Sequence, residues 1–164
     1  MRTRGMRLVG RDGTYQRQYG NYKVQASTNG SDGMDAVVVC GFLQTTSWAK
    51  GFSVEQLQEA FSNSLCFSLF ADEKQIGFAR VITDRVTFAY LCDVYIAEEC
   101  RGRGLGTWLV RCVLEHPTVS NLRRVALITH DAQAFYRRLG FGPAFQADSY
   151  MERLLGLSPV ERIL

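Results

Sequence analysis

One stretch of this chain, residues 88–116, restricts the folds it can adopt more than any other. It begins with the apolar and aromatic run FAYLCDVYI at residues 88–96, which is typical of a buried strand. It ends with apolar residues at helical spacing from Thr107 onward, and Pro117 stops that pattern. Between them lies RGRGLG at residues 101–106, where three glycines alternate with larger residues. The order strand, glycine turn, helix predicts an α/β arrangement with a functional loop.

The chemistry of this loop points to an anion. Glycine has no side chain, so successive backbone N–H groups can turn outward together and contact a bulky anion. The free N–H groups and the positive dipole at the start of the following helix favour the same ligand. The spacing fits neither the dinucleotide fingerprint nor a P-loop. An Arg-Gly RNA-binding segment is an alternative, but such segments lie in polar disordered regions. We therefore predict a pyrophosphate site.

Periodicity and turn residues predict the other elements. Asp35 is a candidate N-cap for a short helix, although β-branched residues make a strand a competing interpretation there. Ser53 and Gln56 match a capping box, and Asp131 is a candidate N-cap for a later helix that Gly140 ends. Further strands are expected at residues 21–26 (an edge strand), 65–70, 74–83, 125–128 (buried on both faces), 141–145 and 150–154. Antiparallel hairpins followed by strand–helix–strand crossovers indicate an α/β fold with a mixed, mostly antiparallel sheet flanked by helices.

The 164 residues suit one domain, which we expect over residues 21–155. Residues 1–23 contain six basic residues against one acidic residue, whereas the whole chain has a net charge of only +3. We expect residues 1–20 to be a disordered basic tail and 156–164 to be a C-terminal tail. A mitochondrial presequence is an alternative for the first segment, and recruitment of nucleic acid or an acidic protein is a further one. The modest net charge otherwise argues against a nucleic-acid partner.

The five cysteines predict neither a disulfide framework nor a metal site. Their number is odd, and no Cys-x-x-Cys pair occurs. Four lie in apolar stretches, where a thiol behaves as a small hydrophobic group. Cys100 precedes the glycine loop, where its thiol is either reactive or simply structural. No apolar run has the length to span a membrane. These features predict a cytoplasmic protein.

Two motifs give this chain a resemblance to a known family. The spacing Arg101-x-x-Gly104-x-Gly106, after a strand and opening a helix, resembles the acyl-CoA-binding motif of the GCN5-related N-acetyltransferases (GNAT). Residues 132–141, with Tyr136 followed by Gly-Phe, are similar to that family's second signature. The resemblance covers roughly residues 22–155 and implies the acyl-CoA N-acyltransferase fold. It also implies direct transfer from acetyl-CoA to a primary amine, with a small molecule favoured as acceptor. The alternative is an inactive acyl-CoA-binding or regulatory module, and a homodimer is one option that the resemblance leaves open.

The resemblance also implies roles for particular residues. The backbone of residues 94–96 would pair with the pantetheine arm in a gap between two strands, and the Val94 N–H would polarise the thioester carbonyl. Tyr136 would protonate the departing thiolate, unless it is only a core aromatic residue. Thr129 stands where the family often has Asn. The residues expected to contact acetyl-CoA are Val94, Tyr95, Ile96, Arg101, Gly102, Arg103, Gly104, Leu105, Gly106, Thr107, Thr129 and Tyr136.

The general base and the acceptor pocket are less defined. Tyr90 stands where histone-type members place a glutamate, so Asp93 is a candidate base or substrate anchor. The competing interpretation is a structural salt bridge between Asp93 and Arg80. His130 is a weaker candidate base. The residues expected to line the acceptor pocket are Trp48, Phe78, Arg80 and Tyr90. An Arg80 that faces the pocket would favour an acceptor with a carboxylate, such as an amino acid.

Overall fold

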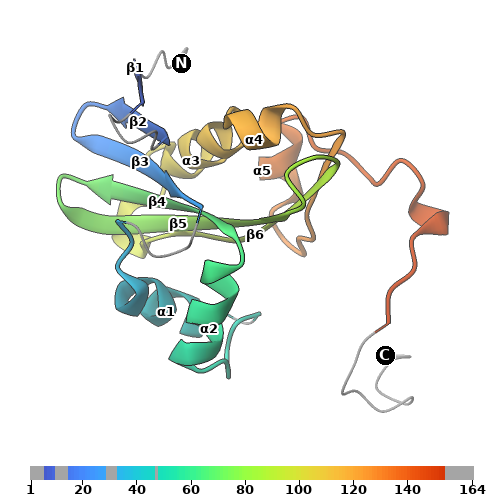
Figure 1. The fold of residues 1–164 in the computed structure, drawn as a ribbon, viewed down its shortest axis with the longest axis horizontal. Helices are drawn as coiled ribbons and strands as arrows, with labels where there is room; N and C mark the ends of the chain where they lie inside the picture. The colour runs from blue at the N-terminus through green and yellow to red at the C-terminus, as the bar shows by residue number, and fades with distance from the viewer. Residues whose placement is uncertain (1–5, 10–14, 29–32, 47, 154–164) are drawn as a thin grey trace.

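A mixed sheet forms the centre of the protein in the computed structural model, which describes residues 6–9, 15–28, 33–46 and 48–153 (Figure 1). The strand order along the sheet follows the chain order, and seven strands lie within the described residues. Every neighbouring pair is antiparallel except β6 and β7, which are parallel. The strands are β1 (Met6–Val9), β2 (Tyr15–Tyr19), β3 (Tyr22–Ser27), β4 (Leu65–Ala71), β5 (Lys74–Thr83), β6 (Phe88–Ile96) and β7 (Arg124–Ala126). The predicted mixed, mostly antiparallel sheet is therefore confirmed.

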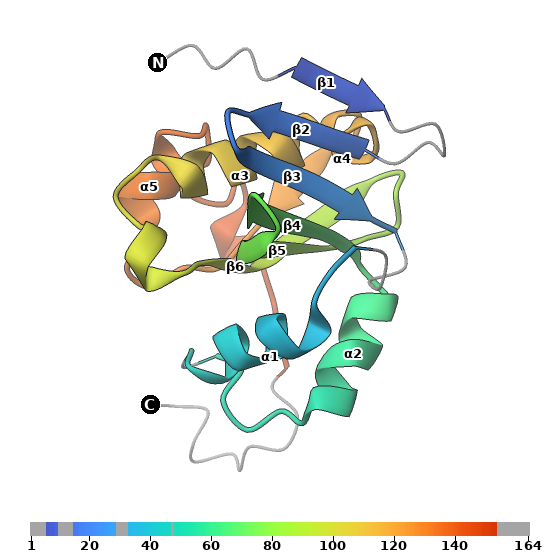
Figure 2. The same cartoon turned by 90° about the vertical axis from the view of Figure 1, so that its left-hand side faces the viewer.

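Helices cover both faces of this sheet. Helices α1 (Ala36–Gln44) and α2 (Val54–Ser62) lie on one face, and α3 (Leu105–Leu114), α4 (Pro117–Ser120) and α5 (Gln133–Arg137) lie on the other (Figures 1 and 2). Each face has its own apolar core. Leu109 and Val110 of α3 are fully buried over one face, and Leu43 of α1 is fully buried over the other. The sheet thus separates two cores and holds both layers of helices.

The first two helices begin where their capping residues predict. The Asp35 side chain accepts a hydrogen bond from the Val38 N–H at 3.1 Å. The Ser53 hydroxyl accepts one from the Gln56 N–H at 3.2 Å, and the Gln56 side chain accepts one from the Ser53 N–H at 2.9 Å. Both caps satisfy N–H groups that have no partner within the helix. The helix interpretation for the segment after Asp35 is confirmed.

The expectation of a disordered tail over residues 1–20 is wrong for the part of it that is described. Met6–Val9 and Tyr15–Tyr19 are strands, and β2 pairs with β3 along its length. Tyr15 is buried in the larger core, so one aromatic residue anchors an otherwise polar strand. The expected edge strand, β3, is consequently an internal strand. Residues 1–5, 10–14 and 154–164 lie outside the described residues.

The C-terminal part of the chain departs furthest from the sequence-based expectations. Strand β7 ends at Ala126 and is only half-buried, with Ile128 exposed, so it is not a strand buried on both faces. The side chain of Thr129, not that of Asp131, accepts a hydrogen bond at the start of α5, from the Ala132 N–H at 3.1 Å. The strands expected at 141–145 and 150–154 do not form in the described residues. That segment contains only a short 3-10 turn, Ala147–Ser149.

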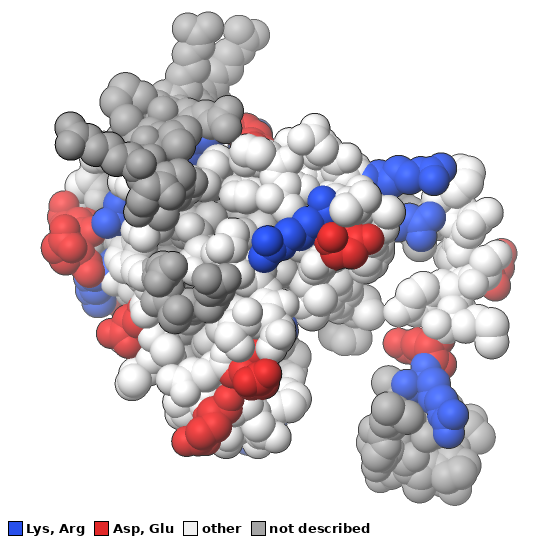
Figure 3. All heavy atoms as spheres, in the orientation of Figure 1, with Lys and Arg blue, Asp and Glu red and all other residues white. Residues whose placement is uncertain are grey.

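The cysteines and the surface fit the compositional expectations. All five cysteines are free thiols. Among the described helices, none combines the length and the apolar character needed to cross a membrane. Basic and acidic side chains are interspersed among uncharged ones on the face drawn in Figure 3. That face carries no broad field of one sign.

Candidate active site

The glycine loop forms an open cradle at the start of α3. The helix begins at Leu105, two residues earlier than the sequence pattern predicted, and its first intrahelical bond joins the Trp108 N–H to the Gly104 carbonyl at 3.0 Å. The N–H groups just before Trp108 therefore have no partner in the helix. Gly102 and Gly104 have φ values of 75° and 79°, and a Cβ atom added at either would meet no heavy atom within 4 Å. The loop thus leaves room for a bulky anion beside unpaired N–H groups.

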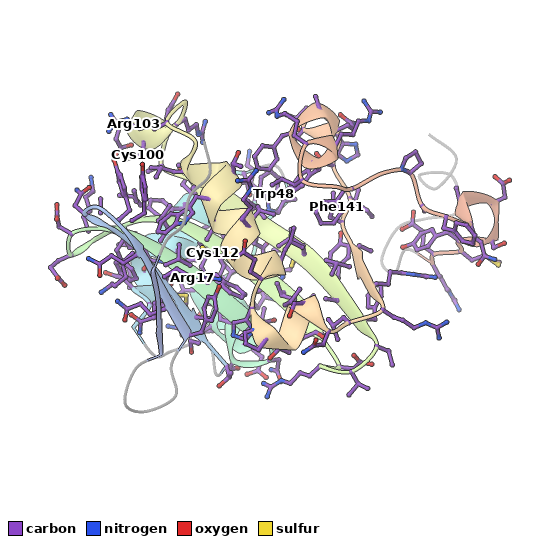
Figure 4. All side chains as sticks on the ribbon, turned by 90° about the horizontal axis from the view of Figure 1, so that it is seen from above. Arg17, Trp48, Cys100, Arg103, Cys112 and Phe141 are labelled. Carbon is purple, nitrogen blue, oxygen red and sulfur yellow. The ribbon has the colours of Figure 1, made fainter. Side chains whose placement is uncertain are left out.

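Two arginines border this cradle. The Arg101 Nε donates a hydrogen bond to the Ile96 carbonyl at 3.0 Å, and its guanidinium lies 5.5 Å from the centre of the Tyr95 ring. The Arg103 side chain donates to the Glu99 carbonyl at 3.1 Å. In Figure 4, Arg103 and Cys100 lie together at the N-terminal end of α3. Both exposed guanidinium groups therefore stand beside the loop and add positive charge to it.

Strand β6 leads into the loop and offers an unpaired edge. Its parallel pairing with β7 covers only Phe88 to Tyr90, and β7 ends at Ala126. The second half of β6 has no β7 partner among the described residues. On the other side, the pairing of β6 with β5 shifts register between Phe78 and Arg80, which is a β-bulge. An unpaired strand edge of this kind can in general pair with an extended chain that carries amide groups, as an added strand would.

Asp93 lies in this bulge and forms an ion pair with Arg80. The Arg80 Nε donates to Asp93 Oδ2 at 2.5 Å, and the side chains are 16% and 9% exposed. Arg80 Nη1 also donates to the Ser64 hydroxyl at 3.2 Å. Burial lowers the pKa of the Arg80 guanidinium and the Asp93 carboxylate raises it, with a net increase. The interpretation of Asp93 as one partner of a salt bridge with Arg80 is confirmed.

Tyr136 lies on α5 within an aromatic group. Its ring packs edge-on against Phe135 at 4.8 Å and against Phe141 at 5.7 Å between centroids. Burial, with a smaller contribution from Cys92 on β6, raises the pKa of the Tyr136 phenol to about 12. The phenol therefore stays protonated at neutral pH and can donate a proton. Tyr136 packs against the larger apolar core, as Val94 and Ile96 of β6 do.

The residues expected in the acceptor pocket do not form one group. Phe78 is fully buried and packs edge-on against Phe61 at 5.3 Å between centroids, so the prediction that it lines a pocket is wrong. Trp48 is 56% exposed between α1 and α2, and Tyr90 is half-buried on β6. Arg80 is tied to Asp93 and Ser64, which limits its capacity to bind an acceptor carboxylate.

Most of this chain is similar to proteins of one known family. A profile of the Acetyltransferase (GNAT) family matches residues 40–141, which is more than half of the chain. The chain belongs to the GNAT family. A solved structure from Xanthomonas campestris, named as an acetyltransferase of this family, is 43% identical with a TM-score of 0.74, and the match covers 80% of this chain and 93% of that one.

Two further proteins show the range of similarity. A protein of Gibberella zeae named as an acetyltransferase is 34% identical over an alignment of 113 residues. The match covers 57% of this chain and 64% of the relative, so the chain spans less than two thirds of that protein. A Clostridium acetobutylicum structure named as an acetyltransferase with acetyl-CoA is 15% identical, with a TM-score of 0.61. The match covers 82% of this chain and 96% of the chain in that structure. At that identity the likeness shows the GNAT fold alone.

Sequence reasoning missed several residues of this GNAT domain that the structure brings together. Phe42 of α1 stacks on Tyr95 with ring centroids 4.6 Å apart, and Arg101 also lies over Tyr95. Cys92 lies opposite Arg80 in the strand register. A cavity of about 590 Å³ borders Phe42, Tyr95 and the turn between β4 and β5. Strand alternation places Cys92 and Arg80 on one face once the register is known, but no sequence signal points to the contact between Phe42 and Tyr95.

Proposed function

We propose that this GNAT protein transfers the acetyl group of acetyl-CoA directly to a primary amine of a small-molecule acceptor. The observation that carries this proposal is the open glycine cradle of α3, which directly follows the unpaired edge of β6. A pyrophosphate joined to a chain with amide groups is the ligand that matches both features. Acetyl-CoA has these two parts in this order, and it supplies the activated acetyl group when bound.

We assign the donor contacts to the glycine cradle and to the edge of β6. The backbone N–H groups of residues 102–107 would bind the pyrophosphate, and Arg101 and Arg103 would add positive charge. The backbone of Val94, Tyr95 and Ile96 would pair with the amide arm. Thr129 keeps its hydroxyl engaged at the start of α5, so its contribution to donor binding would be small. These contacts use backbone groups for most of the recognition, which makes the site insensitive to many side-chain changes.

The chemistry requires one bond to form and one to break. The amine nitrogen forms a bond to the acetyl carbon, and the bond from that carbon to sulfur breaks. The Val94 N–H would stabilise the negative charge that gathers on the carbonyl oxygen. The Tyr136 phenol would donate a proton to the departing sulfur. The proton that the amine loses would leave through water, because the Asp93 carboxylate is held by Arg80.

The acceptor would enter from the side of α1 and α2. Tyr90 and Arg80 share the sheet face that these helices cover, and Trp48 lies in the connection between the helices. We propose Trp48 and Tyr90 as acceptor contacts on this basis. We also propose a homodimer and a cytoplasmic location; five free thiols are consistent with the location.

The decisive test is thermal unfolding with and without acetyl-CoA, comparing Gly104→Asp with Gly20→Asp. Both glycines have positive φ, 79° and 59°, and neither would place a new Cβ within 4 Å of a heavy atom. The two substitutions therefore impose similar backbone strain and the same charge. A ligand that binds only the folded state raises the melting temperature. We expect acetyl-CoA to stabilise the unaltered protein and Gly20→Asp, and to leave Gly104→Asp unchanged. Absence of any shift at saturating acetyl-CoA would disprove donor binding.

A catalytically inactive acyl-CoA-binding module is the second candidate, and one observation favours it. The Asp93 carboxylate, which precedes Val94 in the chain, is held in an ion pair. A panel of amines, including amino acids and polyamines, separates the two functions by release of the free CoA thiol. Thiol release that depends on one class of amine supports the transferase. A thermal shift without release for every amine would instead support the binding module.

A further inference from the structure

Asp93 has an unusual backbone conformation for a residue inside a strand. Three non-glycine residues of the described chain have positive φ, and two of them, Asp72 and Arg85, lie in turns between strands. Asp93, with φ of 52°, lies within β6 itself. The left-handed region is disfavoured for residues with a Cβ atom, although Asp tolerates it better than most. Something in the surrounding structure must therefore hold Asp93 in this conformation.

The β-bulge explains where the strain is located. Phe78 pairs with Tyr95 and Arg80 pairs with Cys92, so Asp93 and Val94 together lie opposite Ala79 alone. A bulge of this kind leaves one residue outside the ladder and redirects the backbone and side chains around it. The redirected residues adjoin the part of β6 that has no β7 partner. The bulge thus sets the direction in which the backbone near Val94 faces the gap.

The Arg80 side chain fixes this bulge at a defined position. Its Nε contacts the Asp93 carboxylate at 2.5 Å and its Nη1 contacts the Ser64 hydroxyl at 3.2 Å. Ser64 is itself buried, and its hydroxyl donates to the Ala60 carbonyl of α2 at 2.7 Å. The guanidinium therefore connects the end of α2 to the bulge through planar, directional hydrogen bonds. Little solvent reaches the pair, so water competes weakly for it.

We propose that Arg80 and Asp93 are positioning residues that hold the β6 bulge and so aim the Val94 N–H at the donor carbonyl. This inference rests on the proposed function, because it assigns the N–H that the pair would orient. Neither side chain needs to contact the acetyl group. The proposal differs from the interpretation of Asp93 as a general base, since a base must be free to accept a proton from the amine.

The test compares Asp93→Asn, Arg80→Met and the double variant, with Glu115→Gln as the matched control. Asn keeps the shape of Asp93 and its tolerance of positive φ but removes the charge. Glu115 pairs with Arg17 at 2.7 Å, so its substitution makes the same chemical change in another ion pair. Each variant is assayed for kcat, for KM of acetyl-CoA and for the pH dependence of kcat.

We expect kcat to fall about 10²-fold in Asp93→Asn and in Arg80→Met, because a small misplacement of a reacting group has costs of this size. KM for acetyl-CoA should change by less than about threefold, since the cradle is untouched. The kcat of the double variant should be no lower than that of either single variant, because each single substitution already removes the same ion pair. Glu115→Gln should match the unaltered protein. Loss of the pH dependence of kcat in Asp93→Asn alone, with Arg80→Met active, would overturn the proposal and identify Asp93 as the base.

A second measurement does not depend on activity. The Val94 amide resonance is followed in protein labelled with [15N]valine and assigned with Val94→Ile. It should shift in Arg80→Met and stay unchanged in Glu115→Gln. An unchanged Val94 resonance in Arg80→Met would overturn the positioning role even if activity falls. If Arg80→Met fails to fold, Arg80→Lys replaces it, because Lys keeps the charge but lacks the second hydrogen bond to Ser64. Failure of the proposed function itself would appear separately, as a missing acetyl-CoA thermal shift in the unaltered protein.

Discussion

The Tyr15 phenol donates a hydrogen bond of 2.9 Å to the Cys112 carbonyl oxygen, and this bond joins β2 to the last turn of α3. The carbonyls of a last helical turn have no continuing helix to bond with. The His116 N–H bonds to the Val113 carbonyl at 3.1 Å, one residue beyond Cys112. Tyr15 therefore supplies a partner for the Cys112 carbonyl. In Figure 4, Cys112 and Arg17 of β2 lie close together at this junction.

Tyr15→Phe should lower the free energy of unfolding by about 1–2 kcal/mol, because it keeps the ring but removes two hydrogen bonds of the phenol. These are the bond to the Cys112 carbonyl and the one that the phenol oxygen accepts from Arg17 Nε at 3.1 Å. Urea unfolding measures this change. Tyr19→Phe on the same strand is the matched control, since Tyr19 is 39% exposed, and it should have little effect. Equal stability of Tyr15→Phe and the unaltered protein would show that β2 contributes nothing through these bonds.

Local signals in the sequence predicted much of this structure. Asp35, Ser53 and Gln56 act through hydrogen bonds within three residues, so their position in the chain is enough to predict them. The glycine loop is equally local, because its geometry depends on positive φ at Gly102 and Gly104. Most features that sequence reasoning predicted correctly have partners close in the chain, and the ion pair between Arg80 and Asp93, 13 residues apart, is an exception.

Features with distant partners were less predictable. Strand β2 has a polar sequence, and the burial of Tyr15 against the core anchors it. In this strand Tyr15, Arg17 and Tyr19 alternate with glutamines, which is only a weak indication of a strand. The apolar run after Arg124 suggested a buried strand, but β6 diverges from it after Tyr90 and leaves it half-covered. The conformation of Asp93 depends on the register of β5, which no local pattern specifies.

Gly77→Ala should destabilise the protein by roughly 1–3 kcal/mol, the usual range for overpacking in a core. A Cβ atom at Gly77 would lie 2.8 Å from Ile96 Cδ1 and 3.0 Å from the Tyr95 carbonyl oxygen. The backbone oxygen cannot move without displacing β6. Thermal and urea unfolding measure the loss.

The control for Gly77→Ala is Gly41→Ala in α1. A Cβ atom at Gly41 would meet no heavy atom within 4 Å. Ala is favoured over Gly in a helix by up to about 1 kcal/mol, so this variant should be more stable than the unaltered protein. The two glycine substitutions should thus change the free energy of unfolding in opposite directions. A stabilising Gly77→Ala would mean that β6 can move away from β5 at this point.

Tyr136→Phe should reduce kcat by about 10²-fold, because it removes the proposed proton donor to the departing sulfur. The ring contacts with Phe135 and Phe141 remain, so stability should change little. Since burial and Cys92 raise the pKa of Tyr136 to about 12, its ionisation should cause no fall in kcat below about pH 11. Unchanged kcat in a variant that still binds acetyl-CoA would make Tyr136 a core residue only.

Stability should fall as the pH rises above about 8.5, the ordinary pKa of a thiol in an unfolded chain. Burial raises the pKa values of Cys66, Cys92 and Cys112 to about 12. At pH values between the ordinary and the raised pKa, the unfolded chain loses thiol protons that the folded chain keeps. The folded state therefore becomes less stable relative to the unfolded state as the pH rises. Each thiol can contribute up to about 1.4 kcal/mol per pH unit. Urea unfolding from about pH 7.5 to about pH 10 measures the slope.

Cys66→Ala provides the control for this slope. Removing one buried thiol should make the decline in stability with pH shallower, whatever the effect on stability at neutral pH. A slope identical to that of the unaltered protein would show that Cys66 does not ionise with the transition. Stability that does not change over the whole pH range would contradict the raised pKa values of all three thiols.

The order of the strands has a consequence for how the chain is made on the ribosome. Because strand order follows chain order, each strand from β2 to β6 can pair with one already synthesised. The parallel strand β7 needs the crossover through α3 and α4, and Tyr136 emerges only after it. Contacts between neighbours in sequence form faster than distant ones. We therefore expect a nascent chain to acquire its antiparallel scaffold first and to become competent for the donor last, once the final crossover has left the exit tunnel.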